Sequence, residues 1–123
     1  MTGDELSQAL LCYRFRYDNE KMLQGGVAGA LDDLKVAYTP EYALNETDRI
    51  DFFVAGDGIG IEVKTNDSKG GAGLSAVLRQ LWRYAKSDQV KSLVIVTTRS
   101  KHRDLPSEIL GKPLHVIHLH GFV

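Results

Sequence analysis

The stretch Asp51–Lys64, DFFVAGDGIGIEVK, decides the fold that we expect for this chain. It contains two apolar runs on either side of Gly-Asp-Gly at positions 56–58. Glycine and aspartate tolerate the positive φ that a tight chain reversal needs, so the stretch predicts a β-hairpin. We place its two strands at 49–55 and 59–65.

Charged residues gather on one face of this hairpin. Side-chain alternation puts Glu62 and Lys64 on the same face of the second strand. Folding back at the turn brings Asp51 opposite either Glu62 or Lys64, because a register shift of two residues keeps the face. Two neighbouring carboxylates repel each other, and one lysine offsets them only weakly. A hard divalent cation bound by oxygen ligands fits such a cluster.

The composition is that of one soluble globular domain spanning residues 1–123, with 43% hydrophobic and 25% charged residues. No apolar run approaches the ~18–20 residues of a membrane span, so no membrane partner is expected. No signal segment opens the chain. The one cysteine, Cys12, has no partner for an internal disulfide. It favours a cytoplasmic setting, in a bacterium or, for a phage-encoded protein, in the host.

Charge is distributed unevenly along the chain, although the formal net charge is only −1. Residues 1–63 hold 5 Lys/Arg and 12 Asp/Glu, whereas residues 64–103 hold 9 Lys/Arg and 2 Asp. A basic segment beside an acidic cluster is typical of a polyanion-binding face next to a metal site. The candidate phosphate contacts are Lys69, Arg79, Arg83 and Lys86.

The rest of the chain alternates helical and strand-like patterns. These predict helices over 4–16, 19–36 and 74–87, and strands over 37–44, 92–98 and 114–119. Pro40 puts the first of these strands near a sheet edge, and the continuous apolar run at 92–98 is typical of a buried central strand. We expect a basic loop at 99–104 and at most a helical turn at 107–110. The order predicts an α/β fold (α+β, with a mixed sheet of about five strands) flanked by helices.

Three glycines, Gly25, Gly26 and Gly29, interrupt the second predicted helix, which Asp18 or Asn19 can cap. Each glycine costs a helix ~1 kcal/mol relative to alanine. We therefore expect the backbone to approach the sheet or a ligand closely there.

Asp51, followed after a hairpin by Glu62-Val63-Lys64, resembles the PD-(D/E)xK nuclease superfamily, with Ile50 in place of the proline. The predicted order of helix, strand, hairpin, helix and strand matches the superfamily core over about residues 18–119. The resemblance implies a restriction-endonuclease-like fold that binds Mg²⁺ or Mn²⁺.

Two helices carry further likenesses to this superfamily. Glu20 stands where a glutamate from the helix before the first strand often joins the site, and Glu20-x-x-x-Gln24 resembles the opening of the virus-type replication-repair (VRR-Nuc) nucleases. Gln80-x-x-x-Tyr84 resembles a pattern that supports the site in several branches. The implied catalytic residues are Glu20, Asp51, Glu62, Lys64 and Gln80.

The resemblance also implies a role for each residue. Asp51, Glu62 and the backbone carbonyl of Val63 would bind the cation, with Glu20 binding it through water. Lys64 would orient or deprotonate the attacking water and stabilise charge on the phosphate. Gln80 would hold a ligand or the lysine by a hydrogen bond.

The function implied is a DNA endonuclease of the Holliday-junction-resolvase or VRR-Nuc kind, selective for junctions or branched DNA in repair, recombination or phage replication. A symmetric substrate suits a homodimer, with the sheet edge or the aromatic residues Tyr13, Phe15 and Tyr17 as candidate interfaces. Two alternatives stay open: a non-catalytic nucleic-acid-binding accessory subunit, and an RNA-processing nuclease on the same fold.

Other residues have two interpretations each. His118 and His120 share a strand face and suit zinc, but a terminal strand with one solvated face also explains them. Trp82 suits either stacking on a base or packing at an interface.

Overall fold

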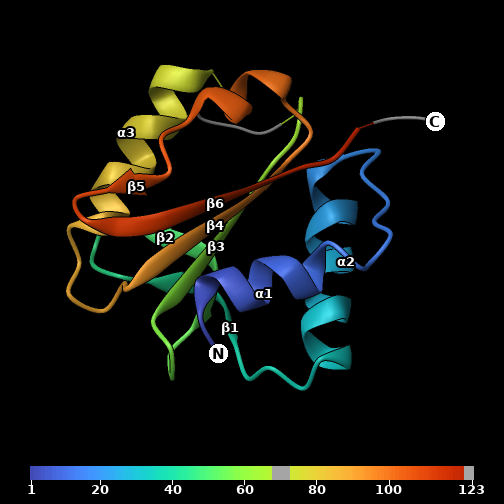
Figure 1. Cartoon of the computed structure of the whole chain (residues 1–123), viewed down its shortest axis with the longest axis horizontal. Coiled ribbons are helices and arrows are strands. Elements are labelled where there is room, and N and C mark those ends of the chain that lie inside the picture. Colours follow the sequence, from blue (N-terminus) through green and yellow to red (C-terminus); the bar gives the residue numbers. More distant parts are fainter. Residues whose placement is uncertain (68–72, 121–123) are drawn as a thin grey trace.

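The protein folds around one six-stranded sheet, seen in a computed structural model that describes residues 1–67 and 73–120. Its helices are α1 (Gly3–Leu10), α2 (Glu20–Asp33), α3 (Leu74–Ala85) and the 3₁₀ helix η1 (Ser100–Asp104). The strands are β1 (Thr39–Ala43), β2 (Arg49–Val54), β3 (Ile59–Lys64), β4 (Ser92–Thr97), β5 (Glu108–Ile109) and β6 (Lys112–His118). In the sheet they follow the order β1-β2-β3-β4-β6-β5 (Figure 1).

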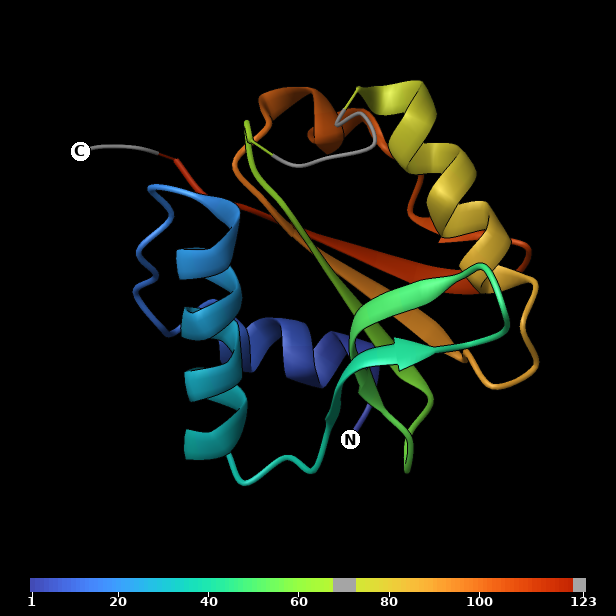
Figure 2. The same ribbon diagram turned by 180° about the vertical axis from the view of Figure 1, so that it is seen from behind.

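The sheet is mixed and covered on both faces. Strands β1, β2 and β3 are antiparallel, β4 and β6 run parallel to β3, and β5 pairs antiparallel with β6. Helices α1 and α2 cover one face, and α3 covers the other (Figure 1, Figure 2). This α/β arrangement confirms the predicted class and is consistent with a restriction-endonuclease-like core. Among the described residues, no helix is long and apolar enough to cross a membrane.

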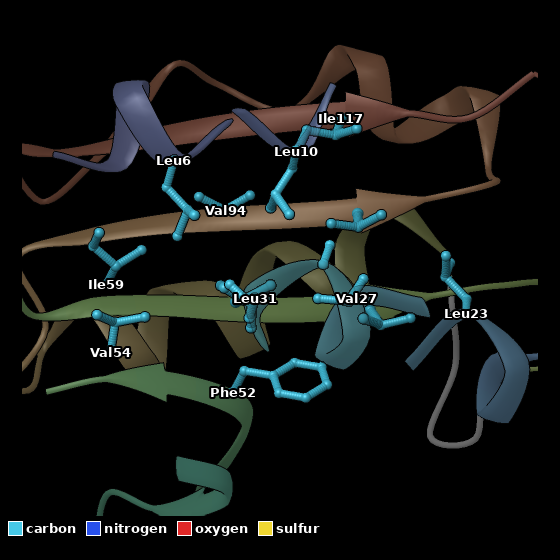
Figure 3. Packing of buried hydrophobic residues seen from close by; sticks show 14 residues of the cluster. Leu6, Leu10, Leu23, Val27, Leu31, Phe52, Val54, Ile59, Val94 and Ile117 are labelled. Carbon is cyan, nitrogen blue, oxygen red and sulfur yellow. The ribbon is translucent and has the colours of Figure 1, made fainter. Parts of the chain in front are cut away.

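Each face of the sheet buries its own hydrophobic core. Figure 3 shows the core beneath α1 and α2, which includes Leu6, Leu10, Leu23, Val27, Leu31, Phe52, Val54, Ile59, Val94 and Ile117. The core beneath α3 is built around Val77, Leu81, Leu93 and Ile95. β4 lies between the two cores with all six residues buried, as its continuous apolar run predicts.

The central hairpin forms as predicted. β2 and β3 pair antiparallel around a turn in which Gly58 has a φ of 65°. A Cβ added there would also lie 2.8 Å from the Gln89 carbonyl oxygen. Backbone conformation and close approach both require glycine at this position. β1, which contains Pro40, lies at the sheet edge as predicted.

The first helix is shorter than predicted. α1 ends at Leu10 instead of continuing to residue 16. Tyr13, Phe15 and Tyr17 lie in a non-helical segment, and their half-buried rings pack against the core beneath α1 and α2. Their alternation, which suits an extended chain, outweighs the helical spacing of Tyr13 and Tyr17.

Residues 107–110 form a strand and turn where a helical turn was the prediction. Glu108–Ile109 is β5, which pairs with the first two residues of β6. Leu110 and Gly111 have φ values of 52° and 77°, the geometry of a two-residue type I′ hairpin turn. Leu110 is an unusual residue for that turn, which explains why the sequence does not reveal it. The predicted basic loop at 99–104 is largely the 3₁₀ helix η1.

α2 begins after Asn19, whose side chain accepts a hydrogen bond from the Met22 amide at 2.8 Å. Only one of its three glycines has a close neighbour. A Cβ at Gly26 would lie 3.1 Å from the Phe15 ring, whereas a Cβ at Gly25 or Gly29 would meet no atom within 4 Å. The close neighbour at Gly26 is thus a ring of the segment before α2, and none of the three glycines makes the predicted close approach to the sheet.

Replacing Gly29 with alanine should stabilise the protein. Open space surrounds this exposed helical position, so alanine removes a penalty of ~1 kcal/mol without a clash. We expect the melting temperature to rise by a few degrees, measured by circular dichroism. Gly26→Ala is the matched control, because its methyl group would press on the Phe15 ring. Equal gains at both positions would contradict this account.

Candidate active site

β2 and β3 separate at the point where Asp51 and Glu62 face each other. Their backbone pairing ends at Phe52↔Ile61, and extending this register puts Asp51 opposite Glu62. Beyond that pair β2 continues alongside β1, and β3 continues alongside β4. The two strands therefore open into a fork, which Figure 2 shows as their divergence away from the hairpin turn. Of the two registers that the sequence leaves open, this is the one formed.

Two carboxylates replace the ladder hydrogen bonds at the fork. The Val63 amide donates to Asp51 Oδ2 at 2.8 Å, and the Asp51 amide donates to Glu62 Oε1 at 3.3 Å. The N–H and C=O groups of one strand residue point to the same side, so the Val63 carbonyl also faces the fork. The fork thus gathers hard oxygen donors from Asp51, Glu62 and Val63.

A kink in β2 aims Asp51 into the fork. Side chains on a strand alternate between faces, yet Ile50 and Phe53 both belong to the core beneath α3. Opposite this break, β1 has its own irregularity at Glu41, whose φ is 47°. Ile50 can lie on that face because β3 provides Gly60 there, where a Cβ would come within 2.9 Å of Ile50 Cδ1.

Lys64 lies on the same strand face as Glu62, as the alternation predicts. Both side chains are buried, and Lys64 Nζ lies 3.3 Å from Glu62 Oε2. Desolvating two charges offsets most of their mutual attraction, so a buried ion pair contributes little to stability. Its presence beside a second carboxylate points to a functional role.

The fork carries more negative charge than its lysine offsets. Burial and, to a lesser extent, the nearby Asp51 charge together raise the pKa of Glu62 to about 8 against the opposing effect of Lys64. Burial also raises the pKa of Asp51 to about 6, although the Val63 amide and Lys64 lower it. Both carboxyls are therefore in surroundings that favour their neutral forms unless a further positive charge is present.

α2 brings Glu20 and Gln24 to the fork. Glu20 is the first residue of the helix, and its charge raises the pKa of Asp51. Gln24, one turn later, hydrogen-bonds to the Asp51 carboxylate. Asp67 ties this helix to the end of β3, because its carboxylate accepts from the Glu20 amide at 3.0 Å and from the Thr65 hydroxyl.

α3 reaches the fork from the opposite face through Tyr84. The tyrosine hydroxyl donates to the Arg49 carbonyl at 2.8 Å and accepts from Gln80 Nε2 at 2.9 Å. Burial raises the pKa of Tyr84, and the charges of Glu62 and Asp51 raise it further. Gln80 thus acts on the site through Tyr84, whereas the sequence predicts a bond to a metal ligand or the lysine.

Gln24 and Tyr84 are two site residues that the predicted catalytic set omits. Each follows a predicted residue, Glu20 or Gln80, by four positions. Residues i and i+4 lie on the same face of a helix, so a side chain that reaches the fork has its i+4 neighbour beside it. The sequence patterns Glu20-x-x-x-Gln24 and Gln80-x-x-x-Tyr84 contain both residues at this spacing, although the predicted catalytic set takes only the first residue of each.

The predicted phosphate contacts on α3 are exposed. Arg79, Arg83 and Lys86 lie on the solvent side of the helix and its C-cap. Arg83 also binds the buried carboxylate of Asp48, with Nε 3.0 Å from Oδ1, so a phosphate would meet the other nitrogens of its guanidinium. Lys69 lies outside the described residues.

A pocket of about 430 Å³ lies at the ends of β3 and β4, beside the segment that precedes α2. It is lined by Tyr17, Asp18, Thr65, Asn66, Asp67, Thr98 and Leu119. Its two carboxylates disfavour a phosphodiester backbone. The cationic side of the site is therefore the α3 side.

Within residues 1–67 and 73–120, no group of three His, Cys, Asp or Glu side chains is arranged to hold a metal ion. His118 and His120 have ring centroids 4.5 Å apart, but they are two ligands without a third. A cation at the fork would accordingly combine two carboxylates with the Val63 carbonyl and water.

Comparisons of the chain with protein-family models, with curated proteins and with solved structures found no match. The functional assignment therefore depends on the residues at the fork. They combine paired carboxylates, a main-chain carbonyl and a buried lysine within one hairpin.

Glu62 should make the metal-free protein less stable as pH rises. Its pKa is raised from 4.5 to about 8, so the folded chain holds this proton more tightly than the unfolded chain does. Between these two pH values the unfolded chain binds fewer protons, and the free energy of unfolding therefore falls as pH rises. We expect a lower melting temperature at about pH 8 than at about pH 5.5, measured in EDTA.

Glu62→Gln is the matched control, because it keeps the side-chain shape and lacks the titrating proton. Its melting temperature should depend less on pH over the same range than that of the unsubstituted protein. Identical pH slopes for the two proteins would contradict the raised pKa.

Proposed function

We propose that this protein is a divalent-cation-dependent endonuclease of the PD-(D/E)xK type that hydrolyses phosphodiester bonds in DNA, preferring junctions or other branched forms. The observation that carries the proposal is the fork, where the Asp51 and Glu62 carboxylates meet beside the buried ammonium of Lys64. Phosphodiester hydrolysis uses oxygen ligands for a cation together with fixed positive charge at the phosphate, and the fork supplies both.

The donors at the fork fit Mg²⁺ or Mn²⁺. The oxygens of Asp51, Glu62 and Val63 are hard ligands of the kind that these cations take. The raised pKa values of both carboxyls indicate negative charge that a cation would balance. The chemistry supplied by such a cation is acidification of a bound water and neutralisation of charge on the scissile phosphate.

Lys64 supplies positive charge that belongs to the protein itself. Its ammonium is shielded from solvent and held 3.3 Å from the Glu62 carboxylate, so its position is set before substrate binds. A preorganised cation stabilises the negative charge that develops on phosphate oxygens. One of its N–H donors can also orient the attacking water.

Side chains from both helical layers hold this geometry. Gln24 binds the Asp51 carboxylate, and Glu20 adds a third acidic group that would bind the cation through water. On the other face, Tyr84 holds the backbone carbonyl two residues before Asp51, and Gln80 orients the Tyr84 hydroxyl. Gln24, Tyr84 and Gln80 have positioning roles, because each acts through another residue of the site.

The proposed substrate is recognised by shape. Contacts to phosphates position a protein on DNA without reading its sequence, and the exposed cations of α3 are side chains of that kind. A symmetric junction offers two equivalent strands to cut, which suits the predicted two-fold homodimer. RNA has the same phosphodiester linkage, so an RNA substrate belongs in the test.

Cleavage should require a divalent cation and the residues of the fork. The substrates to compare are a four-way junction, a flap, nicked, single-stranded and duplex DNA, and RNA, each with Mg²⁺, Mn²⁺ or EDTA. We expect Asp51→Asn, Glu62→Ala and Lys64→Ala to lower the cleavage rate by at least ~100-fold while most DNA binding is retained. Gel-resolved single-turnover rates measure the effect.

Asp57→Asn is the matched control, since it changes an exposed aspartate at the tip of the same hairpin and should cut at the normal rate. Rapid cleavage by Asp51→Asn or Lys64→Ala would remove the proposed site. Binding without cleavage of any substrate would favour the accessory-subunit alternative, and selective cutting of RNA would favour the RNA-processing one.

Mg²⁺ should stabilise the protein in the absence of substrate. A ligand at tenfold its Kd adds about 1.4 kcal/mol to the free energy of unfolding if it binds only the folded chain. The melting temperature should therefore rise with Mg²⁺ at about pH 8, with a smaller rise near pH 5.5, where protons compete for the carboxylates. Asp51→Asn should abolish this rise. An equal rise in that variant would place the cation elsewhere.

A further inference from the structure

The helix that supports the site on its inner side exposes an aromatic ring on its outer side. Trp82 is 45% exposed, although it lies between Gln80 and Tyr84 in sequence. At 3.6 residues per turn, the ring projects away from those two side chains. The body of α3 therefore lies between the ring and the Gln80 and Tyr84 side chains that face the site.

All the charged residues of this helix and its C-cap are cationic. Residues 74–87 contain Arg79, Arg83 and Lys86 and no aspartate or glutamate. Lys86 Nζ lies 4.7 Å from the centroid of the Trp82 ring, and Arg79 is on the same outer side of the helix. We call Arg79, Trp82 and Lys86 the α3 platform.

A second copy of the chain is a poor occupant for the platform. In a two-fold contact the same patch meets itself, so Arg79 and Lys86 of one copy would face those of the other. Like charges brought together in this way oppose association. The occupant favoured by charge complementarity is a polyanion.

Trp82 narrows the choice among polyanions. Every base has a π-face that can stack on an indole ring, and such stacking is tolerant of sequence. Bases in a duplex are already stacked on one another, so the ring would bind a strand that is unpaired. The acidic lining of the pocket near α2, with Asp18 and Asp67, disfavours a path on that side of the site.

We propose that the α3 platform binds an unpaired DNA strand, with a base stacked on Trp82 and phosphates held by Arg79 and Lys86. This inference deepens the proposed function, since it names the substrate class as branched DNA with a single-stranded arm, such as a flap or splayed end. A fully paired four-way junction would lack the strand that the platform binds.

Trp82 is the one tryptophan in the sequence, so its fluorescence reports directly on the platform. The full chain is titrated in EDTA with a short oligothymidine, with a duplex of equal length, and with inorganic polyphosphate, which has the charge without bases. We expect oligothymidine to quench the fluorescence most strongly, and the other two, which contact the cations without stacking on the ring, to change it less. Anisotropy of labelled DNA measures binding in parallel.

Variants separate stacking from charge. Trp82→Leu should weaken binding of the single strand by about 5- to 150-fold, which corresponds to ~1–3 kcal/mol for one stacked base, with little effect on duplex. Trp82→Phe should restore most of the affinity. Arg79→Gln should weaken binding of both DNA forms and reduce the slope of log affinity against log salt by about 1. Leu78→Ser, which changes another exposed apolar residue of α3, is the matched control and should bind normally.

Binding of the single strand without quenching, or equal losses for single strand and duplex in Trp82→Leu, would overturn the proposal. So would a dimer that Trp82→Leu converts to monomer in sedimentation, because the occupant would then be a second copy. These measurements need no cation and no cleavage, so their failure is distinct from that of the proposed nuclease. Unchanged melting temperatures would show that the variants are folded.

Discussion

The site exists because the backbone ladder between β2 and β3 stops at Phe52↔Ile61 and the next two amides donate to carboxylates instead. A buried N–H group left without an acceptor costs ~1–3 kcal/mol. Asp51 and Glu62 therefore stabilise the very strands whose separation makes room for them. The fold and the site share these contacts, so neither carboxylate can be understood as an addition to a finished scaffold.

The same contacts bury more negative than positive charge. Glu62 and Lys64 are both buried, and Asp51 adds a second carboxylate to a pair that one ammonium already balances. A protein in which well-packed apolar residues replace a buried ion pair is often as stable as the original or more stable. Buried charges that do not improve stability are expected at functional positions, where the excess negative charge is available to bind a ligand.

Much of this architecture is readable from local patterns. The two-residue period of β3 places Glu62 and Lys64 together, and the Gly-Asp-Gly turn fixes the hairpin that brings Asp51 beside them. The kink at Asp51 is not readable in this way. It depends on the positive φ of Glu41 in one neighbouring strand and on the missing side chain of Gly60 in the other, contacts that no local pattern records.

The segment after α1 shows how two periodicities can compete. Tyr13 and Tyr17 are four residues apart, which suits a helix, while Tyr13, Phe15 and Tyr17 also alternate, which suits an extended chain. The Phe15 ring lies against Gly26 of α2, a position where any Cβ would crowd it. The contact between Phe15 and Gly26 thus favours the extended conformation of residues 13–17. It joins residues that are distant in sequence, so a local pattern does not reveal it.

α3 is fixed to the sheet on its inner side and presents cationic side chains and Trp82 on its outer side. Lys112 of β6 donates to the Ala85 and Ser87 carbonyls at 2.6 and 2.8 Å, which satisfies the end of the helix, and Tyr84 fastens its inner side to β2. A helix held at these points keeps Trp82 at a fixed distance from the fork. For a strand stacked on that ring, the number of nucleotides between the stacked base and the scissile phosphate would then be set by the fixed position of the helix.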